Sequence, residues 1–326
     1  MYKQVSTVTQ PSDIAVEVSN VTKINEQWQR AGGLHDIVHN LIKPQKKTIA
    51  ALDDVSFQVQ RGEFVAYAGP NGAGKSTTIK LLCGMLAPAS GDIRLLGLSP
   101  LKYRIPLMKR VGILFGNRTE LWWDHPVSTS FEWKRRVWDI PDDRFQVMRD
   151  MVVELLDIQP FLHTFARELS LGQRMRADLA LMLLHEPEVI LLDEPTLGLD
   201  VLAKRQMIRF LQQLNREKGT TIIVTSHDMD DLEEMARRIL LLSQGKLAFD
   251  GNFTQLRQFI GCQRKVTVRF ADGTQRIQDV EQEAIPALLN ELSQAGNVVD
   301  IDFEQAPLED ALADLFQRWN QSTTAE

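Results

Sequence analysis

The sequence predicts an α/β protein built around a parallel or mixed sheet, followed by a small α+β domain, and two patterns lead to this prediction. Across residues 50–250, short apolar runs typical of strands alternate with longer stretches of helical periodicity, an order that favours a sheet covered by helices. Beyond Gly251 the pattern changes to a shorter series of strands and helices. We expect the large domain at residues 1–255, the small one at 262–320 and a tail at 321–326.

Two parts of the large domain are expected outside its sheet core. Val55–Val59 alternates apolar and polar residues, which predicts a half-buried strand of an antiparallel β subdomain. Residues at about 117–170 carry helical patterns at Ser128–Trp138 and Asp143–Leu156, and these predict a helical subdomain.

The mixed sheet core and the small domain take the remaining elements. Core strands are expected at Glu63–Ala68, Glu188–Leu192 and Thr221–Ser226. A helix at Ser76–Leu86 is expected to stop because Pro88 follows. In the small domain we expect strands at Lys265–Phe270 and Val298–Phe303 and helices at Ile285–Ala295 and Pro307–Trp319.

Composition limits the classes of function. The chain has a formal net charge of −6, so nothing indicates a basic surface for nucleic acid. Its two cysteines, Cys83 and Cys262, are too few and too far apart for a disulfide framework or a zinc site, which favours a reducing compartment. The first residues lack a signal-peptide core, and no apolar run approaches the roughly 20 residues that span a bilayer. Any membrane role is therefore expected to come through a partner.

A glycine-rich motif indicates a nucleotide site. Its residues are Gly69, Pro70, Asn71, Gly72, Ala73, Gly74, Lys75, Ser76 and Thr77. They match G-x-x-x-x-G-K-[ST] between an expected strand and an expected helix. The loop N–H groups and the helix N-terminus attract phosphate. Lys75 is suited to the β- and γ-phosphates and the Ser76 hydroxyl to Mg²⁺. A simple linking turn is the alternative, which the full motif in this context disfavours.

Two carboxylates indicate hydrolysis of the bound nucleotide. The apolar run Val189–Leu192 ends in Asp193 and Glu194. At the carboxyl end of a buried strand, Asp193 is suited to hold Mg²⁺ directly or through water. Glu194 is suited to act as the general base that activates water. An isolated pair of this kind is also common as two surface acids after a strand.

Further stretches resemble the ATP-binding subunits of ABC transporters. They are the signature-like LSLGQ at 169–173, DEPTLGLD at 193–200, and TSHD at 225–228, which follow the phosphate loop in the family's order. The resemblance covers about residues 12–250. It implies that His227 contacts the γ-phosphate and helps to orient the water. It also implies that Ser170, Gly172 and Gln173 bind the ATP of an opposite subunit, although Ser170 equally suits a helix N-cap.

The sequence departs from the family pattern at three points. The third signature residue is Leu171 instead of Gly. Asn117 stands where the family has the glutamine that contacts nucleotide and Mg²⁺, and it offers the same amide on a stem shorter by one methylene. The adenine-stacking aromatic is missing after the first strand, and Trp28 is the nearest candidate.

Asn117, LSLGQ and an insertion before residue 51 make the chain similar to an uncharacterised subfamily of bacterial exporter ATPases, of the daunorubicin-resistance and sodium-export type. The run Pro307–Asp310 echoes a P-x-LED helix of such ATPases. The resemblance implies a head-to-tail dimer with ATP and Mg²⁺ at its seam, pairing with transmembrane permease subunits. It also implies a peripheral location at the cytoplasmic face of the inner membrane.

Two local features leave alternatives open. In the insertion, Leu34, Ile37, Val38, Leu41 and Ile42 form one helical face, before Lys43, Lys46 and Lys47. This 34–47 segment either packs on its own domain, the favoured interpretation, or touches the membrane or the permease. Trp122 and Trp123 are either anchors for the permease or core residues of the helical subdomain.

Two rival functions remain at this stage. One is a non-transport ABC ATPase, which the single cassette and acidic balance disfavour. The other is a nucleotide-gated clamp with little turnover, which Asn117 and Leu171 leave open.

Overall fold

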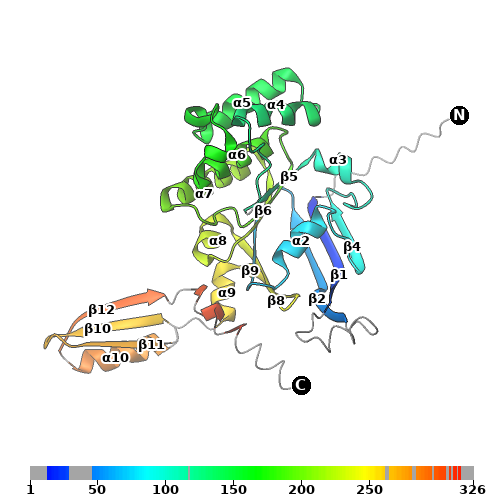
Figure 1. The fold of residues 1–326 in the computed structure, drawn as a ribbon. Coiled ribbons are helices and arrows are strands. Elements are labelled where there is room, and N and C mark those ends of the chain that lie inside the picture. The colour runs from blue at the N-terminus through cyan, green and yellow to red at the C-terminus, as the bar shows by residue number, and fades with distance from the viewer. Residues whose placement is uncertain are drawn as a thin grey trace, which may run out of the picture. The chain divides into compact units, whose positions relative to one another are not determined.

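The computed structural model describes residues 13–28, 46–116, 118–260, 264–280, 284–295, 297–305, 308–309, 311–313 and 315–316 (Figure 1). The chain divides into two compact units. The first holds Met1–His227 and Asp231–Asp250, and the second holds Asp228–Asp230 and Gly251–Glu326.

A three-stranded antiparallel sheet opens the first unit, in the order β2-β1-β4. Its strands are β1 (Ile14–Trp28), β2 (Lys46–Gln60) and β4 (Ser90–Leu95). Val16 pairs with Val59, and Val18 pairs with Phe57. These residues are all buried, because alternate residues of a strand point to the same face. The antiparallel strand predicted at Val55–Val59 is part of β2.

The core of the unit is a six-stranded sheet in the order β5-β6-β7-β3-β8-β9. The strands are β5 (Val111–Phe115), β6 (Val189–Asp193), β7 (Thr221–Thr225), β3 (Phe64–Ala68), β8 (Arg238–Ser243) and β9 (Lys246–Asn252). The first five are parallel. A two-residue turn with positive φ at Gln244 and Gly245 leads into β9, which is hairpin geometry and makes the sheet mixed, as expected.

Helices cover this sheet (Figure 1). They are α2 (Lys75–Leu82), α3 (Arg104–Met108), α7 (Val201–Lys218) and α8 (Met229–Met235). The prediction that the first of these runs to Leu86 was wrong. Gly84 adopts a φ of 64°, and the N–H groups of Met85 and Leu86 return to the carbonyl of Lys80. A glycine in the left-handed region ends the helix before Pro88 can.

The predicted helical subdomain contains α4 (Val127–Val137) and α5 (Asp142–Leu155). A further helix, α6 (Leu171–Leu183), begins just after the predicted bounds and packs against both. In Figure 1 these helices gather at one end of the unit, in green. Short 3₁₀ turns at Gln159–Phe161 and Ala166–Glu168 link them. Phe131, Val152 and Leu179 are among their fully or nearly fully buried side chains, so the subdomain has its own apolar interior.

The second unit contains α9 (Phe253–Phe259), α10 (Ile285–Ala295) and an antiparallel sheet in the order β11-β10-β12. The strands are β10 (Arg264–Phe270), β11 (Gln275–Val280) and β12 (Val298–Gln305). The apolar cluster on this sheet includes Val266, Val268, Leu288 and Leu292. Strand β11 was not predicted, because its residues Gln275–Val280 are mostly polar.

Several predictions fall outside the described residues. Only parts of the helix expected at Pro307–Trp319 are described, and these are helical. Within the second unit, Glu309 accepts a hydrogen bond of 3.1 Å from the N–H of Met229. The helix expected near residues 34–42, the side chain of Trp28, and Asn117 all lie outside the described residues. No helix that is described combines the length and the hydropathy needed to cross a bilayer.

Candidate nucleotide-binding site

The phosphate loop joins the carboxyl end of β3 to the first turn of α2. A Cβ atom at Gly69 would lie 2.3 Å from the carbonyl oxygen of Leu242, and one at Gly74 would lie 2.5 Å from that of Ala51. The φ angles there are 149° and 111°. Only glycine fits both positions, because any side chain would collide with backbone. The loop is therefore wrapped tightly between β8 and β2.

Lys75 is the cation at the centre of this loop. Its side chain is buried, and Nζ donates to the carbonyl of Gly69 at 2.6 Å and to that of Pro70 at 3.2 Å. Burial lowers the pKa of Lys75, while the nearby charges of Glu194 and Asp193 act in the opposite direction. The N-terminus of α2 adds the positive end of its dipole at the same place. The arrangement suits an anion of high charge.

Asp193 lies at the carboxyl end of β6 and accepts two hydroxyl hydrogen bonds. Ser76 Oγ donates to its Oδ1 at 3.1 Å, and Thr225 Oγ1 donates to the same oxygen at 2.7 Å. Hydroxyl and carboxylate oxygens are ligands that Mg²⁺ prefers. No group of three or more His, Cys, Asp or Glu side chains that could hold a metal occurs among the described residues. A metal at Ser76 and Asp193 would therefore share its coordination with phosphate and water.

Thr225 is a residue to which the sequence analysis gave no role. It is fully buried, and its Oγ1 also accepts from the N–H of Glu194 at 3.1 Å. One hydroxyl thus holds both neighbouring acids. It can do so because β6 and β7 pair in parallel with Asp193 opposite Thr225. The sequence shows a threonine at the end of an apolar strand, but it does not show which strand lies beside it.

Glu194 and His227 meet beside this group. Glu194 has a φ of 55°, which is a costly conformation for a residue with a side chain. Its N–H donates to both the carbonyl and the hydroxyl oxygen of Thr225, each at 3.1 Å. His227 Nδ1 lies 3.6 Å from Glu194 Oε1. A carboxylate and an imidazole that flank one point can move a proton to or from a bound water.

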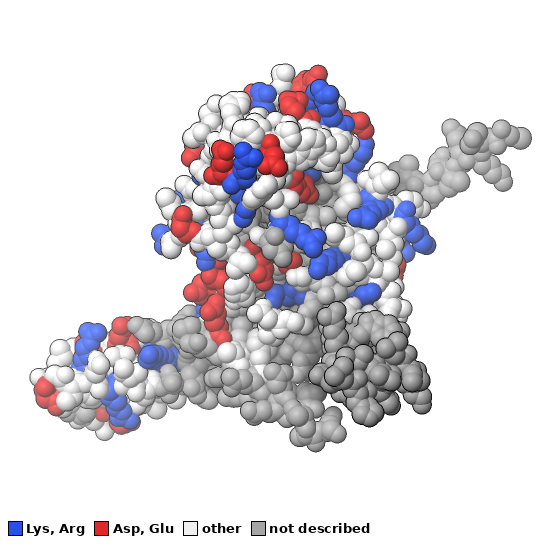
Figure 2. Space-filling model, in the orientation of Figure 1, with Lys and Arg blue, Asp and Glu red and all other residues white. Residues whose placement is uncertain are grey.

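The charges around the site are unevenly distributed. In Figure 2, blue side chains lie over the region of α2 and red ones gather around α8. The sequence of α8 holds Asp230, Asp231, Glu233 and Glu234. On the face drawn in Figure 2, basic side chains therefore lie over the region of the helix that begins at the phosphate loop.

The signature residues form a separate cluster at the start of α6. Ser170 caps the helix, accepting from the N–H of Gln173 at 3.2 Å, while Gln173 Oε1 accepts from the N–H of Ser170 at 2.9 Å. Leu171 packs over Gly198, since a Cβ atom built on Gly198 would lie 2.6 Å from Leu171 Cδ2. Among the described residues, no hydrogen bond joins Ser170, Gly172 or Gln173 to the phosphate loop. The contacts of these signature residues are to the start of α6 and to the segment around Leu199 and Ala203 instead.

The segment after Asn117 is anchored to α6 through a buried carboxylate. Asp178 accepts from Thr119 Oγ1 at 2.9 Å and from the N–H of Glu120 at 3.0 Å. Burial raises the pKa of Asp178 to about 6, against the lowering effect of these hydrogen bonds. Asp178 was not predicted as a site residue, because one acid inside a helical pattern looks like a solvated residue.

Trp122 and Trp123 lie in the same segment, two and three residues after Glu120. They are 37% and 49% exposed, which excludes the interpretation that they are core residues. The ring centroids of Trp122 and Trp133 are 5.4 Å apart. Trp122 and Trp133 thus pack together, and with the adjacent Trp123 they are three exposed tryptophans of this region, called here the aromatic surface.

Comparison with known proteins gives the family. Residues 52–197 match the family model described as ABC transporter. A putative ABC transporter ATP-binding protein of Clostridium acetobutylicum is 31% identical over 208 residues, which are 63% of this chain and 75% of the relative. The chain belongs to the ABC transporter ATP-binding proteins.

Other relatives of this ABC protein agree on the cassette and differ in length. The uncharacterised ABC transporter ATP-binding protein YhcH of Bacillus subtilis is 36% identical over 196 residues, 60% of this chain. The chain spans 63% of that relative and 36% of a putative Vibrio vulnificus ABC transporter ATP-binding protein. A solved structure of cbiO1 from Clostridium perfringens has a TM-score of 0.62 at 25% identity, and covers 76% of this chain and 94% of its own. The predicted ABC fold is confirmed.

Proposed function

We propose that this chain binds Mg-ATP and hydrolyses it to power a membrane transporter of the exporter type. The observation that carries the proposal is the convergence of Lys75, Ser76, Asp193, Glu194 and His227 at the carboxyl ends of β3, β6 and β7. Ligands of open α/β sheets bind at this end of the strands.

Each residue has a chemical task in the proposed reaction. Lys75 and the α2 N-terminus bind the β- and γ-phosphates. Ser76 and Asp193 would hold Mg²⁺, which neutralises phosphate charge when bound. Glu194 accepts the proton of the attacking water as general base. His227 contacts both that carboxylate and the γ-phosphate and so fixes their relative position. Thr225 holds Asp193 and Glu194 at a fixed separation. Asn117 is proposed as a further contact to nucleotide and metal.

The active form is proposed to be a head-to-tail dimer of this chain. Support comes from Ser170, Gly172 and Gln173, which make no hydrogen bond to the phosphate loop of their own chain among the described residues. In such a dimer, the capped N-terminus of α6 in one protomer faces the γ-phosphate bound by its partner. ATP binding then closes the seam, and hydrolysis opens it, because the γ-phosphate is contacted from both sides.

The membrane partner is proposed to dock on the aromatic surface formed by Trp122, Trp123 and Trp133. Exposed tryptophans are strong interface anchors, and the cassette from Clostridium perfringens is described as part of a transporter complex. The dimer would lie peripherally at the cytoplasmic face of the inner membrane. The exporter direction rests on the resemblance to daunorubicin-resistance and sodium-export ATPases, and the Bacillus subtilis relative NatA is 28% identical over 212 residues.

Phosphate release by the purified chain in Mg-ATP tests the proposal. We expect turnover that is abolished by a chelator and restored by added Mg²⁺, since the protein side chains alone leave the phosphate charge uncompensated. Tight ATP binding with dimer formation but no measurable turnover would instead make the chain a nucleotide-gated clamp. Failure to bind ATP would refute the proposal as a whole.

A further inference from the structure

A pocket of about 560 Å³ lies at the other end of the same sheet. Glu188 directly precedes β6, and Thr221 is the first residue of β7, so the pocket lies at the amino ends of strands whose carboxyl ends form the nucleotide site. Its size falls within the range of small-molecule sites, roughly 300–1,000 Å³. None of the nucleotide-site residues lines it.

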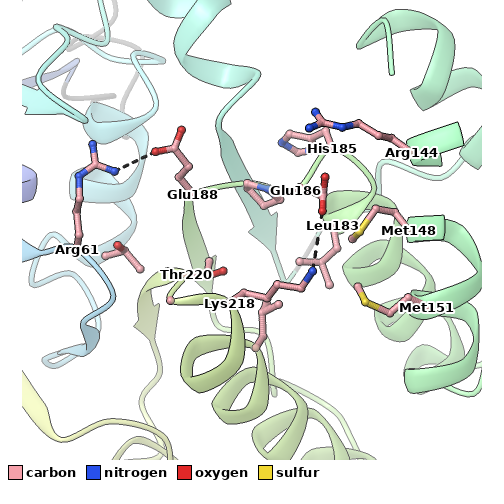
Figure 3. Close-up of a pocket in the computed structure, with 14 residues that line it drawn as sticks. Arg61, Arg144, Met148, Met151, Leu183, His185, Glu186, Glu188, Lys218 and Thr220 are labelled. Carbon is pink, nitrogen blue, oxygen red and sulfur yellow. Dashed lines mark hydrogen bonds and ion pairs between the residues drawn. The ribbon is translucent and has the colours of Figure 1, made fainter. Parts of the chain in front are cut away.

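One wall of the pocket is apolar. Met148 and Met151 point from α5 toward the loop that carries His185 and Glu186 (Figure 3). Leu183 at the end of α6 and Leu214 on α7 also line the space. Met148 and Leu183 are buried. This wall suits an apolar body, and the methionine side chains can adapt to its shape.

On another wall of the pocket, Glu188 forms ion pairs with Arg61 and Arg110. Glu188 accepts from Arg61 at 2.9 Å and from two nitrogens of Arg110, one of them at 2.9 Å. The hydrogen bond from Arg110 is the main cause of the lowered pKa of Glu188. With two guanidinium groups beside it, this carboxylate stays ionised and is already neutralised. It does not repel an anion in the pocket.

The remaining charges favour an anion. The lining residues include three cationic side chains, Arg61, Arg144 and Lys218, and two carboxylates, Glu186 and Glu188. Lys218 approaches Glu186 only to 4.0 Å. Arg144, one turn before Met148 on α5, makes no hydrogen bond or ion pair with any residue that the structure describes. A guanidinium without a partner beside an apolar wall suits a carboxylate or a sulfate.

His185 adds a fixed neutral group to the lining. Its Nε2 lies 3.1 Å from the carbonyl oxygen of Val111, and because a carbonyl only accepts, Nε2 carries the proton. Burial lowers the pKa of His185 to about 4. The ring is therefore uncharged at neutral pH, and the pocket keeps the same charge across the physiological range.

We propose that this pocket binds a small amphiphilic anion, with its apolar part against Met148, Met151, Leu183 and Leu214 and its anionic group at Arg144. The site is independent of the nucleotide chemistry. Because its walls come from α5 of the helical subdomain and from α7 and the strand ends of the sheet core, the ligand links these parts of the first unit.

Octanoate is a suitable probe, and methyl NMR of the full-length protein labelled at its methionine methyl groups is the readout. We expect octanoate to shift the Met148 and Met151 signals in a saturable way, while octylammonium does not. Met85, which is 44% exposed and outside the pocket, reports non-specific adsorption. Equal shifts at Met85, or none at Met148 and Met151, would overturn the proposal.

Charge variants test the anionic contact. Arg144→Gln is expected to weaken octanoate binding about tenfold, as for the loss of one charge-assisted hydrogen bond. Glu186→Gln should strengthen it, because a competing carboxylate is removed. Arg216→Gln is the matched control, since Arg216 is an exposed cation on α7 outside the pocket lining. Equal binding by the Arg144 and Arg216 variants would contradict the assignment. Unchanged signals from the other methionines verify that each variant keeps its fold.

Discussion

The six-stranded sheet carries ionisable groups at both ends of its strands, and the two ends use them differently. At the carboxyl ends, the Asp193 carboxylate accepts from two hydroxyl groups, and Glu194 is held through its backbone N–H, which donates to Thr225. Neither carboxylate has a guanidinium partner among the described residues. At the amino ends, Glu188 is clamped between Arg61 and Arg110. The same strand, β6, links Glu188 to Asp193. One end keeps its carboxylates available for ligands, and the other neutralises its carboxylate.

The contrast has a physical reason. A carboxylate that must coordinate metal or accept a proton cannot be saturated by arginine, because a bidentate guanidinium occupies both oxygens. Neutral donors such as Thr225 orient the acid and leave lone pairs free. Ion pairs at the amino ends serve to fix loops against the sheet. Four tests, which use five substitutions, follow in order of decreasing expected effect.

The largest effect is expected from replacing, one at a time, the two glutamates that flank β6, Glu188 and Glu194. Glu194→Gln should lower phosphate release about 10³-fold while ATP still binds, because the amide cannot accept the proton of water. Glu188→Gln should keep near-normal turnover, since it lies at the other end of the strand. Steady-state phosphate release and nucleotide binding are measured for both. A similar loss in both variants, or near-normal turnover in the Glu194 variant, would remove the distinction between the ends.

Asp178→Asn tests a carboxylate that is buried without a cation. The pKa of Asp178 is raised from 3.8 to about 6, so the folded state binds the proton more tightly than the unfolded state. Its contribution to stability is therefore complete below pH 3.8 and is lost as the pH rises to about 6. Relative to the wild type, the Asn variant should gain up to about 3 kcal/mol of unfolding free energy across that window. Chemical denaturation at several pH values measures this, and a pH-independent difference would contradict it.

Thr225→Val tests the hydroxyl that contacts both Asp193 and Glu194. We expect about a tenfold loss of turnover, the equivalent of one hydrogen bond, because Asp193 and the N–H of Glu194 both lose a partner. Thr221→Val, at the amino end of the same strand, is the control. Its hydroxyl oxygen accepts from the N–H of Gly62 at 2.9 Å, so that variant should lose stability rather than activity. Equal turnover in both variants would show that Thr225 has only a packing role.

The smallest effect is expected from Glu188→Gln on stability. Its side chain is 40% exposed, so solvent screening limits the loss to about 1 kcal/mol at neutral pH. The pKa of Glu188 is lowered in the folded state, which means that its stabilisation is present above its ordinary pKa and disappears as the pH falls through the folded value. The difference between wild type and variant should therefore vanish in acid. A difference that grows in acid would contradict the clamp.

Local motifs in the sequence predict much of the candidate site. The spacing of Gly69, Gly74 and Lys75 predicts the loop, because its geometry depends on adjacent residues only. Asp193 and Glu194 follow an apolar run that could only be a buried strand. For the same reason the mixed sheet, the antiparallel β subdomain and the helical subdomain were all predicted correctly.

Other features were decided by the tertiary structure. Ser76 and Asp193 are 117 positions apart, and Thr225 lies opposite Asp193 only because β6 and β7 are neighbours in the strand order. Strand order is not encoded in local periodicity, so Thr225 could not be assigned from its own segment. The same holds for Asp178, for Leu171 over Gly198 and for the pocket at Arg144. The sequence alone determined which groups could do chemistry, and the tertiary structure decided which of them meet, because those contacts join segments far apart along the chain.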